Sequence, residues 1–201
     1  MTQVILLNGS SSAGKTTLAQ KLQQLLPEPY QYLSLDQFRD GMPERVRGLN
    51  APPGSEGAAG LNVVPVAGGL TAIQFGEYGD RVLASMRQSA ALFACNGIPV
   101  IIDDLLLKPT YVQDYVRHFD VAATWVVGVR CAPDIVSQRE AARTGRFPGT
   151  AAEHFDRVHA AIGDYDVEVD TGLSTPRNAA EQVIARLADP PRCLADLARQ
   201  G

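Results

Sequence analysis

A glycine-rich octapeptide near the start of the chain limits the available folds more than any other feature. Residues 9–16 read GSSSAGKT and match G-x-x-x-x-G-K-[ST] without a mismatch. The motif follows a short run of bulky apolar residues, 4–7, and precedes a helical pattern over 15–26, which is the strand–loop–helix context that it requires. This context disfavours the alternative, a Gly/Ser turn with an exposed lysine. We therefore expect an α/β protein with a phosphate-binding loop (P-loop).

Each constrained position of this loop has a role in binding phosphate. Glycines at both ends let the backbone turn so that successive N–H groups point at the phosphates, and the helix beginning at Lys15 adds its positive dipole end. Lys15 is expected to reach the β- and γ-phosphates of ATP, and the Thr16 hydroxyl to ligate Mg²⁺. The predicted nucleotide-binding residues of the loop are Gly9, Ser10, Ser11, Ser12, Ala13, Gly14, Lys15, Thr16 and Thr17.

Composition is that of an ordinary soluble globular protein. The 201 residues, 45% apolar and 20% charged, suit one α/β domain over residues 1–201. A net charge of −4 argues against nucleic acid as a partner, and no apolar run approaches the roughly 20 residues of a membrane-spanning helix. Three separated cysteines without metal-ligand spacing predict reduced thiols in a cytoplasmic protein. Homo-oligomerisation stays open.

Short apolar runs alternate with helical-period stretches, which is the pattern of βαβ units. The expected fold is that of a P-loop NTPase of the nucleoside-kinase-like kind, with a five-stranded parallel sheet flanked by helices and an arginine lid. Strands are predicted at residues 4–7, 31–35, 99–102, 124–129 and 167–169. Helices are predicted at residues 15–26, 37–47, 75–95, 133–143, 151–162 and 175–187.

Residues 48–69 break this pattern. The stretch is rich in glycine and proline, carries a single charge, Glu56, and has no helical period. Loops of this length in compact domains are usually functional or disordered. We expect an extended loop or a short hairpin around residues 63–66, with residues 48–70 forming a flap on the substrate side; a floppy insertion is the alternative.

Two aspartates, Asp103 and Asp104, follow the apolar strand at 99–102. In open α/β sheets, ligands bind at the carboxyl ends of the strands. One of the pair, Asp103 in preference, is expected to hold Mg²⁺ through water as a Walker-B carboxylate does. The alternative is a helix cap, and which aspartate serves the metal stays open.

Asp36 ends the second predicted strand and therefore points into the same crevice. A carboxylate there could accept the proton of an attacking hydroxyl group, as a general base. Aspartate also suits the N-cap of the helix predicted over 37–47, and the two roles are compatible.

Arginines mark the end of the helix predicted at 133–143. Arg139 and Arg143 lie four residues apart on one face of it, and Arg146 follows. Three guanidinium groups beside a Gly/Pro-flanked turn predict a lid over about 139–150 that clamps charge on the transferred phosphoryl group. Arg139 and Arg143 are thus predicted to be catalytic with Lys15 and Asp36, and Arg139 and Arg146 to contact the nucleotide. The alternative is a solvated basic helix end.

Six short sequence segments, taken together in their order along the chain, are characteristic. They are ILLNGSSSAGK at 5–15, Asp36 with Met42 and Pro43, VIIDD at 100–104, GVRC at 128–131, REAAR at 139–143 and YDVEVDT at 165–171. This set resembles the chloramphenicol phosphotransferase-like family of P-loop kinases. The resemblance implies ATP-dependent phosphorylation of a primary hydroxyl on an antibiotic-like molecule, with Asp36 matching the family's base, and it supports an arginine lid. Residues 48–69 depart from the family, so the acceptor need not be chloramphenicol.

Three functions share this loop chemistry. The first is a small-molecule O-kinase, favoured by the carboxylate of Asp36 on the acceptor side and by the predicted lid. The second is a nucleotide-gated switch or ATPase without an acceptor, and no N-K-x-D guanine-binding motif supports a GTPase. The third is a nucleoside, shikimate-like or other metabolite kinase, which differs only in its acceptor pocket. The acidic net charge argues against a kinase of polynucleotide ends.

Overall fold

The main sheet has five parallel strands. The computed structural model describes residues 2–143 and 147–200, and within them the strand order is β2-β6-β1-β7-β8. Each of these strands coincides with one predicted from an apolar run, so the predicted parallel sheet is confirmed. Their bounds are β1 Val4–Asn8, β2 Gln31–Ser34, β6 Val100–Asp104, β7 Thr124–Arg130 and β8 Val167–Asp170.

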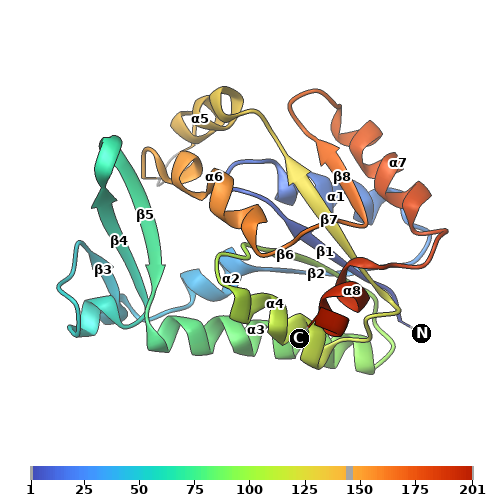
Figure 1. The fold of residues 1–201 in the computed structure, drawn as a ribbon, viewed down its shortest axis with the longest axis horizontal. Coiled ribbons are helices and arrows are strands. Elements are labelled where there is room, and N and C mark those ends of the chain that lie inside the picture. Colours follow the sequence, from blue (N-terminus) through green and yellow to red (C-terminus); the bar gives the residue numbers. More distant parts are fainter. Residues whose placement is uncertain (1, 144–146, 201) are drawn as a thin grey trace.

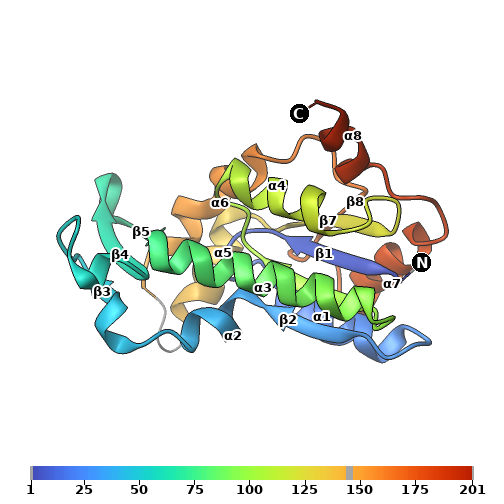
Figure 2. The ribbon, with the colours of Figure 1, turned by 90° about the horizontal axis from the view of Figure 1, so that it is seen from below.

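Helices cover both faces of this sheet (Figures 1 and 2). Successive residues of β1 face opposite sides: Leu6 joins a core formed with α3, α4, α6 and α8, whereas Ile5 and Leu7 join a core formed with α1, α5 and α7. A strand buried on both faces is apolar throughout, as β1 is. The helices are α1 Lys15–Leu25, α3 Glu77–Cys95, α4 Pro109–His118, α5 Pro133–Ala141, α6 Thr150–Ala160, α7 Pro176–Arg186 and α8 Cys193–Gln200.

The central strand β1 lies where the direction of the chain connections reverses. From β1 the chain passes through α1 to β2 on one side, whereas from β6 it passes through α4 to β7 on the other. Asn8, the last residue of β1, pairs with Asp104, the last residue of β6, and with Gly128 of β7, which continues two residues further to Arg130. Ligands of open α/β sheets bind in the crevice at such a point. The P-loop leaves β1 here.

The second helix is shorter than the sequence suggested. α2 covers Leu35–Asp40, and its N-cap is Ser34, whose hydroxyl accepts from the Gln37 N–H while the Gln37 side chain accepts from the Ser34 N–H. The predicted helix over 37–47 is wrong because Pro43 cannot continue a helix; the chain instead forms a 3₁₀ turn, η1 (Glu44–Val46). Asp36 is therefore not the cap, and it lies in the first turn of α2.

A separate three-stranded sheet occupies the segment that broke the pattern, at the left of Figure 1. Its strands are β3 (Arg47–Leu49), β4 (Leu61–Val66) and β5 (Leu70–Phe75), in the order β3-β4-β5, and β4 and β5 form an antiparallel hairpin. Two 3₁₀ turns, η2 (Glu56–Ala58) and η3 (Ala67–Gly69), complete it. Phe75 thus ends a strand, and the helix predicted to start there begins two residues later. No helix of the described residues is long and apolar enough to cross a membrane.

Candidate active site

The P-loop joins β1 to α1 in a tightly packed arc. A Cβ atom on Gly9 would lie 2.3 Å from the carbonyl oxygen of Val129 in β7, so only glycine fits there. Gly14 has a φ of +93° and forms the N-cap of α1. These two positions need glycine, one for space and one for conformation, which explains both glycines of the motif.

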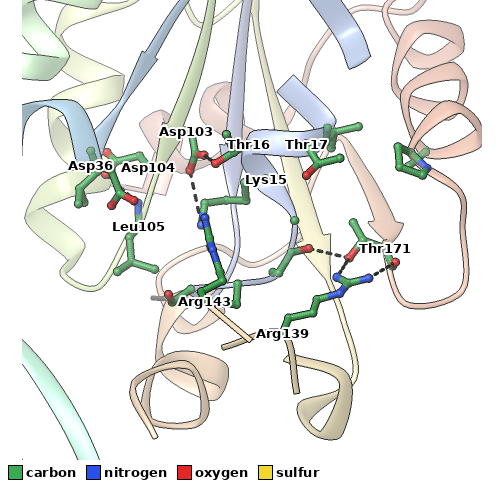
Figure 3. Close-up of a pocket in the computed structure, with 18 of the residues that line it drawn as sticks. Lys15, Thr16, Thr17, Asp36, Asp103, Asp104, Leu105, Arg139, Arg143 and Thr171 are labelled. Carbon is green, nitrogen blue, oxygen red and sulfur yellow. Dashed lines mark hydrogen bonds and ion pairs between the residues drawn. The ribbon is translucent and has the colours of Figure 1, made fainter. Parts of the chain in front are cut away.

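Lys15 lies inside this arc. Its ammonium donates to the carbonyl oxygens of Gly9 (2.8 Å) and Ser10 (3.1 Å), and it lies 3.5 Å from Oδ1 of Asp103. The side chain is mostly buried, and it points into a pocket whose edge carries the Asp103 carboxylate (Figure 3). A buried ammonium beside a helix N-terminus provides concentrated positive charge for phosphate oxygens.

The carboxylate of Asp103 accepts hydrogen bonds from hydroxyl groups of two other elements. Its Oδ2 accepts from the hydroxyl of Thr16 on α1 (3.0 Å) and from that of Tyr32 on β2 (3.1 Å). Burial, with the negative charge of Asp103 second, raises the pKa of Tyr32 to about 12, so this phenol stays protonated and remains a donor. Sequence analysis did not identify Tyr32, because nothing in the sequence of a short strand indicates that its tyrosine contacts an aspartate of the adjacent strand.

Asp104 borders the same cavity, but it is fully buried and its carboxylate is bound by α3 and α4. Its Oδ2 accepts from Nε of Arg87 (2.9 Å) and from the hydroxyl of Tyr115 (2.8 Å), and its Oδ1 accepts from the N–H of Leu105 (2.7 Å). Arg87 is fully buried as well and also contacts Asp114 at 3.3 Å. Asp104 thus belongs to the packing of β6 against α3 and α4, which leaves Asp103 as the carboxylate beside Thr16 and Lys15.

The residues around Thr16 suit Mg²⁺ bound together with a nucleotide. Mg²⁺ prefers oxygen ligands and uses few protein side chains, because phosphates and waters complete its shell. The adjacent oxygens of Thr16 and Asp103 provide such a pair. The structure shows no cluster of three or more His, Cys, Asp or Glu that could hold a metal ion by itself among the residues it describes.

Arg139 is fixed at the end of β8. Its Nη1 donates to Oγ1 of Thr171 (3.0 Å) and its Nη2 to the Thr171 carbonyl oxygen (2.8 Å), while Oγ1 of Thr171 donates to the carbonyl oxygen of Ala13 in the P-loop (2.6 Å). Arg139 is therefore held on the side of the pocket away from Asp36 (Figure 3). This position is suited to contact the nucleotide.

Arg143 lines the same pocket and points into it on the side of Lys15 (Figure 3). Its side chain forms no hydrogen bond or ion pair with residues 2–143 or 147–200. Arg146, the third predicted lid arginine, lies outside the described residues. Arg139 and Arg143 thus occupy different parts of the pocket and do not converge on one point.

The pocket is a cavity of about 550 Å³ over the P-loop. Residues 11–17 line it, whereas Gly9 and Ser10 do not and contribute instead the carbonyls that bind Lys15. A second cavity of about 360 Å³ adjoins it and extends between α2 and the small sheet. The two cavities share four lining residues, Asp36, Arg39, Ile73 and Arg143.

The site also contains residues that no motif indicated. Ile73 and Phe75 of β5, together with Leu35 and Leu105, give the first cavity an apolar wall. Arg39, on α2, forms an ion pair with Asp36 at 2.8 Å. A local signal for Arg39 does exist, since i,i+3 pairs of opposite charge lie side by side on a helix. The apolar wall depends on β5, a strand that the sequence pattern did not predict.

Comparison with known proteins assigns the chain to a family. The model of the family described as chloramphenicol phosphotransferase-like protein matches residues 2–188. The chain belongs to this family. It is also 31% identical over 191 residues to a Mycobacterium tuberculosis protein (strain H37Rv) whose name proposes an O-phosphotransferase; the match covers 90% of this chain and 80% of that protein. The resemblance seen in the six sequence segments is confirmed.

Solved structures show the same fold at much lower identity. A sugar kinase from Janibacter sp. HTCC2649 is similar with a TM-score of 0.64 at 17% identity, covering 94% of this chain and 95% of its own. The APS kinase of Mycobacterium tuberculosis, in complex with AMPPNP and APS, gives a TM-score of 0.62 at 14% identity, covering 94% and 98%. The fold is therefore that of P-loop kinases, as predicted. Family and fold together make the chain a phosphotransferase of the small-molecule kinase class.

Proposed function

We propose that the chain transfers the γ-phosphate of ATP to a hydroxyl group of a small antibiotic-like molecule, chloramphenicol or a related compound. One observation carries this proposal: two adjoining cavities connect the P-loop to a compartment bordered by Asp36 and an apolar wall. A phosphate donor and a hydroxyl acceptor can thus meet between Lys15 and Asp36. A compartment of about 360 Å³ is within the range of small-ligand sites.

The nucleotide occupies the larger cavity in this proposal. The N–H groups of the P-loop and the start of α1 bind its phosphates, and Arg139, fixed on Thr171, lies beside the rest of the nucleotide. Thr16 and Asp103, whose oxygens lie side by side, would hold Mg²⁺. When bound there, the ion would supply positive charge beside the phosphate oxygens.

The acceptor occupies the smaller cavity, between α2 and the small sheet. Leu61, Val63 and Ile73 give it an apolar side, and the charged side chains of Asp36, Arg39, Asp40, Arg47 and Arg143 line the rest, so the compartment offers both packing surface and hydrogen-bonding groups to a hydroxylated small molecule. Residues 48–70 thereby contribute part of the acceptor site. Asp36 lies at the junction of the cavities, where the reacting hydroxyl group would be.

The reaction requires one proton acceptor and stabilisation of negative charge. The acceptor oxygen forms a bond to the γ-phosphorus while the bond from that phosphorus to the bridging oxygen of ADP breaks, and Asp36 takes the hydroxyl proton. Lys15 and Arg143 offset the charge on the phosphoryl oxygens. The three side chains named for these roles all line the larger cavity.

The proposal is tested with Mg-ATP and a panel of acceptors that includes chloramphenicol and nucleosides. We expect ADP formation that depends on a hydroxylated antibiotic, with a product that carries one added phosphate by mass spectrometry. Lys15→Ala should abolish transfer, and Asp36→Asn should lower kcat by about 10²–10⁴-fold, the usual contribution of general base catalysis.

Two nearby variants serve as controls. Lys21→Ala removes a surface lysine of the same helix, and Glu44→Gln removes an exposed carboxylate close to α2; both should retain wild-type turnover. Near wild-type turnover in Asp36→Asn would show the general-base role to be wrong. A nucleoside as the preferred acceptor would replace the antibiotic with a metabolite, and ADP release that requires no acceptor would exclude the kinase function.

A further inference from the structure

A chain of alternating charges extends along the acceptor compartment from α2 to β3. Arg39 lies at its centre, with Asp36 at 2.8 Å from its Nη1 and Asp40 at 2.9 Å from its Nε and 2.8 Å from its Nη2. Nη2 of Arg47, on β3, lies 3.7 Å from the same oxygen of Asp40. The two aspartates therefore bind opposite edges of one guanidinium group.

Arg39 is the enclosed member of this chain. Its side chain is 14% exposed, against 44% for Asp36 and 57% for Asp40. Arg39 lines both cavities and therefore lies where the two compartments meet. The start of the short helix α2 is fixed by the reciprocal hydrogen bonds of Ser34 and Gln37. Asp36 and Arg39 are three residues apart on this helix, so their side chains lie next to each other on its surface.

We propose that Arg39 is a positioning residue for phosphoryl transfer, which orients the Asp36 carboxylate toward the acceptor hydroxyl. Asp40 binds the Nε and Nη2 edge of the guanidinium group and thereby directs Nη1 to Asp36. Arg39 contacts no reacting atom in this account and acts through Asp36. The proposal rests on the proposed function, because it requires Asp36 to serve the acceptor.

Lysine cannot replace arginine in this arrangement. A guanidinium group has a planar set of donors on two edges, whereas an ammonium is a single point charge on a flexible stem. Arg39→Lys therefore keeps the charge and loses the simultaneous contact with Asp36 and Asp40. Arg45→Lys is the matched control, since Arg45 pairs with Glu56 on the same part of the chain and its side chain is 73% exposed.

The test is a double-mutant cycle on transfer from Mg-ATP, with chloramphenicol as the acceptor and transfer to water measured in parallel. Arg39→Met and Arg39→Lys should each lower kcat roughly 10–100-fold, the scale expected for a displaced reacting group, with the KM for ATP unchanged. In the Asp36→Asn background, Arg39→Met should have no further effect, because the residue through which it acts is already gone. Arg45→Lys should leave kcat at the wild-type value.

Two results would overturn the proposal. One is wild-type kcat in both Arg39 variants, and the other is an equal loss of kcat on Arg39→Met with and without Asp36, which would indicate a purely structural effect. If Arg39→Met fails to fold, the cycle is measured with Arg39→Lys. A wild-type enzyme that transfers phosphate to neither acceptor would refute the proposed function and this inference with it, whereas wild-type transfer with an additive cycle refutes the role of Arg39 alone.

Discussion

Two neighbouring aspartates show how much of this site is decided by single residues. Successive side chains of a strand point to opposite faces, so Asp103 and Asp104 of β6 lie in different surroundings. Asp103 contacts Thr16 and Lys15 of the P-loop, and Asp104 contacts Arg87 and is fully buried. Their side chains have the same chemistry, and only their surroundings separate the metal-binding role proposed for Asp103 from the structural contacts of Asp104.

These surroundings predict opposite phenotypes. Asp104→Asn leaves the buried charge of Arg87 poorly compensated and should lower the free energy of unfolding by about 3–5 kcal/mol. Asp103→Asn should change stability by about 1 kcal/mol, the value of a hydrogen bond, and should remove most of the transfer activity. Urea unfolding and transfer assays on the two variants check this. Loss of activity in a fully stable Asp104→Asn protein would contradict the assignment.

The sequence could predict the residues of the P-loop but could not choose between these aspartates. The P-loop is a local motif, and the spacing of its residues alone places Lys15 and Thr16 at the start of a helix. The partners of Asp104 are Arg87 of α3 and Tyr115 of α4, which are distant along the chain and carry no motif. Tertiary packing decides the role of each carboxylate, and the spacing of residues along the chain does not encode it.

At the scale of elements, the small sheet was the hardest part to predict. Phe75 begins an apolar 3–4 spacing that continues into α3, so the end of β5 was assigned to the helix. The short hairpin expected around residues 63–66 coincides with part of β4, which pairs with β5, but Pro65 argued against a full strand there because proline is rare in strand interiors. β3 pairs with β4 only as far as Val63, so the missing N–H of Pro65 removes no bond to β3. The five main strands were easier, because burial on both faces leaves continuous apolar runs.

Helix α6 is the element through which pH should affect stability. Nδ2 of Asn8, the residue before the P-loop, donates to the carbonyl oxygen of Val158 at 2.8 Å and fixes α6 on the end of β1. One turn earlier, His154 is fully buried, and neither ring nitrogen has a hydrogen-bond partner among the described residues. Burial, followed by the positive charges of Lys15 and Arg157, lowers the pKa of His154 to about 3.

The sign of the pH effect follows from this low pKa. The unfolded chain binds a proton on His154 below about pH 6.5, whereas the folded protein does not until about pH 3, so stability is lost as the pH falls between these values. At pH 5 the loss attributable to His154 should be about 2 kcal/mol. His154→Leu should reduce the acid dependence of unfolding by this amount, measured by urea unfolding from pH 4 to 8.

A second histidine, His118, provides the control for this experiment. His118→Gln, on α4, changes a side chain that is only partly buried and should leave the acid dependence close to that of the wild type. An unchanged acid dependence in His154→Leu would contradict the account.

At the scale of the whole molecule, the small sheet and the main domain enclose the site together. Oγ1 of Thr71 in β5 donates to the carbonyl oxygen of Pro148 at 2.8 Å, and Gly149 packs against Leu70 where β5 begins. Carboxylate oxygens of Glu140, on α5, accept from the N–H groups of Gly149 and Ala151 at the start of α6. The two cavities that we propose for nucleotide and acceptor are thus built from one connected framework, which favours direct transfer between them.

Direct transfer is the central claim, and the fate of the γ-phosphate tests it. ATP labelled at the γ-phosphate is incubated with Mg²⁺, the enzyme and chloramphenicol, and the label is followed into ADP, inorganic phosphate and the acceptor. We predict that each ADP formed is matched by one labelled phosphate ester on the acceptor hydroxyl, and that this ester is absent with Lys15→Ala. Label recovered only as inorganic phosphate, at the same rate with every acceptor of the panel and with none, would contradict the account.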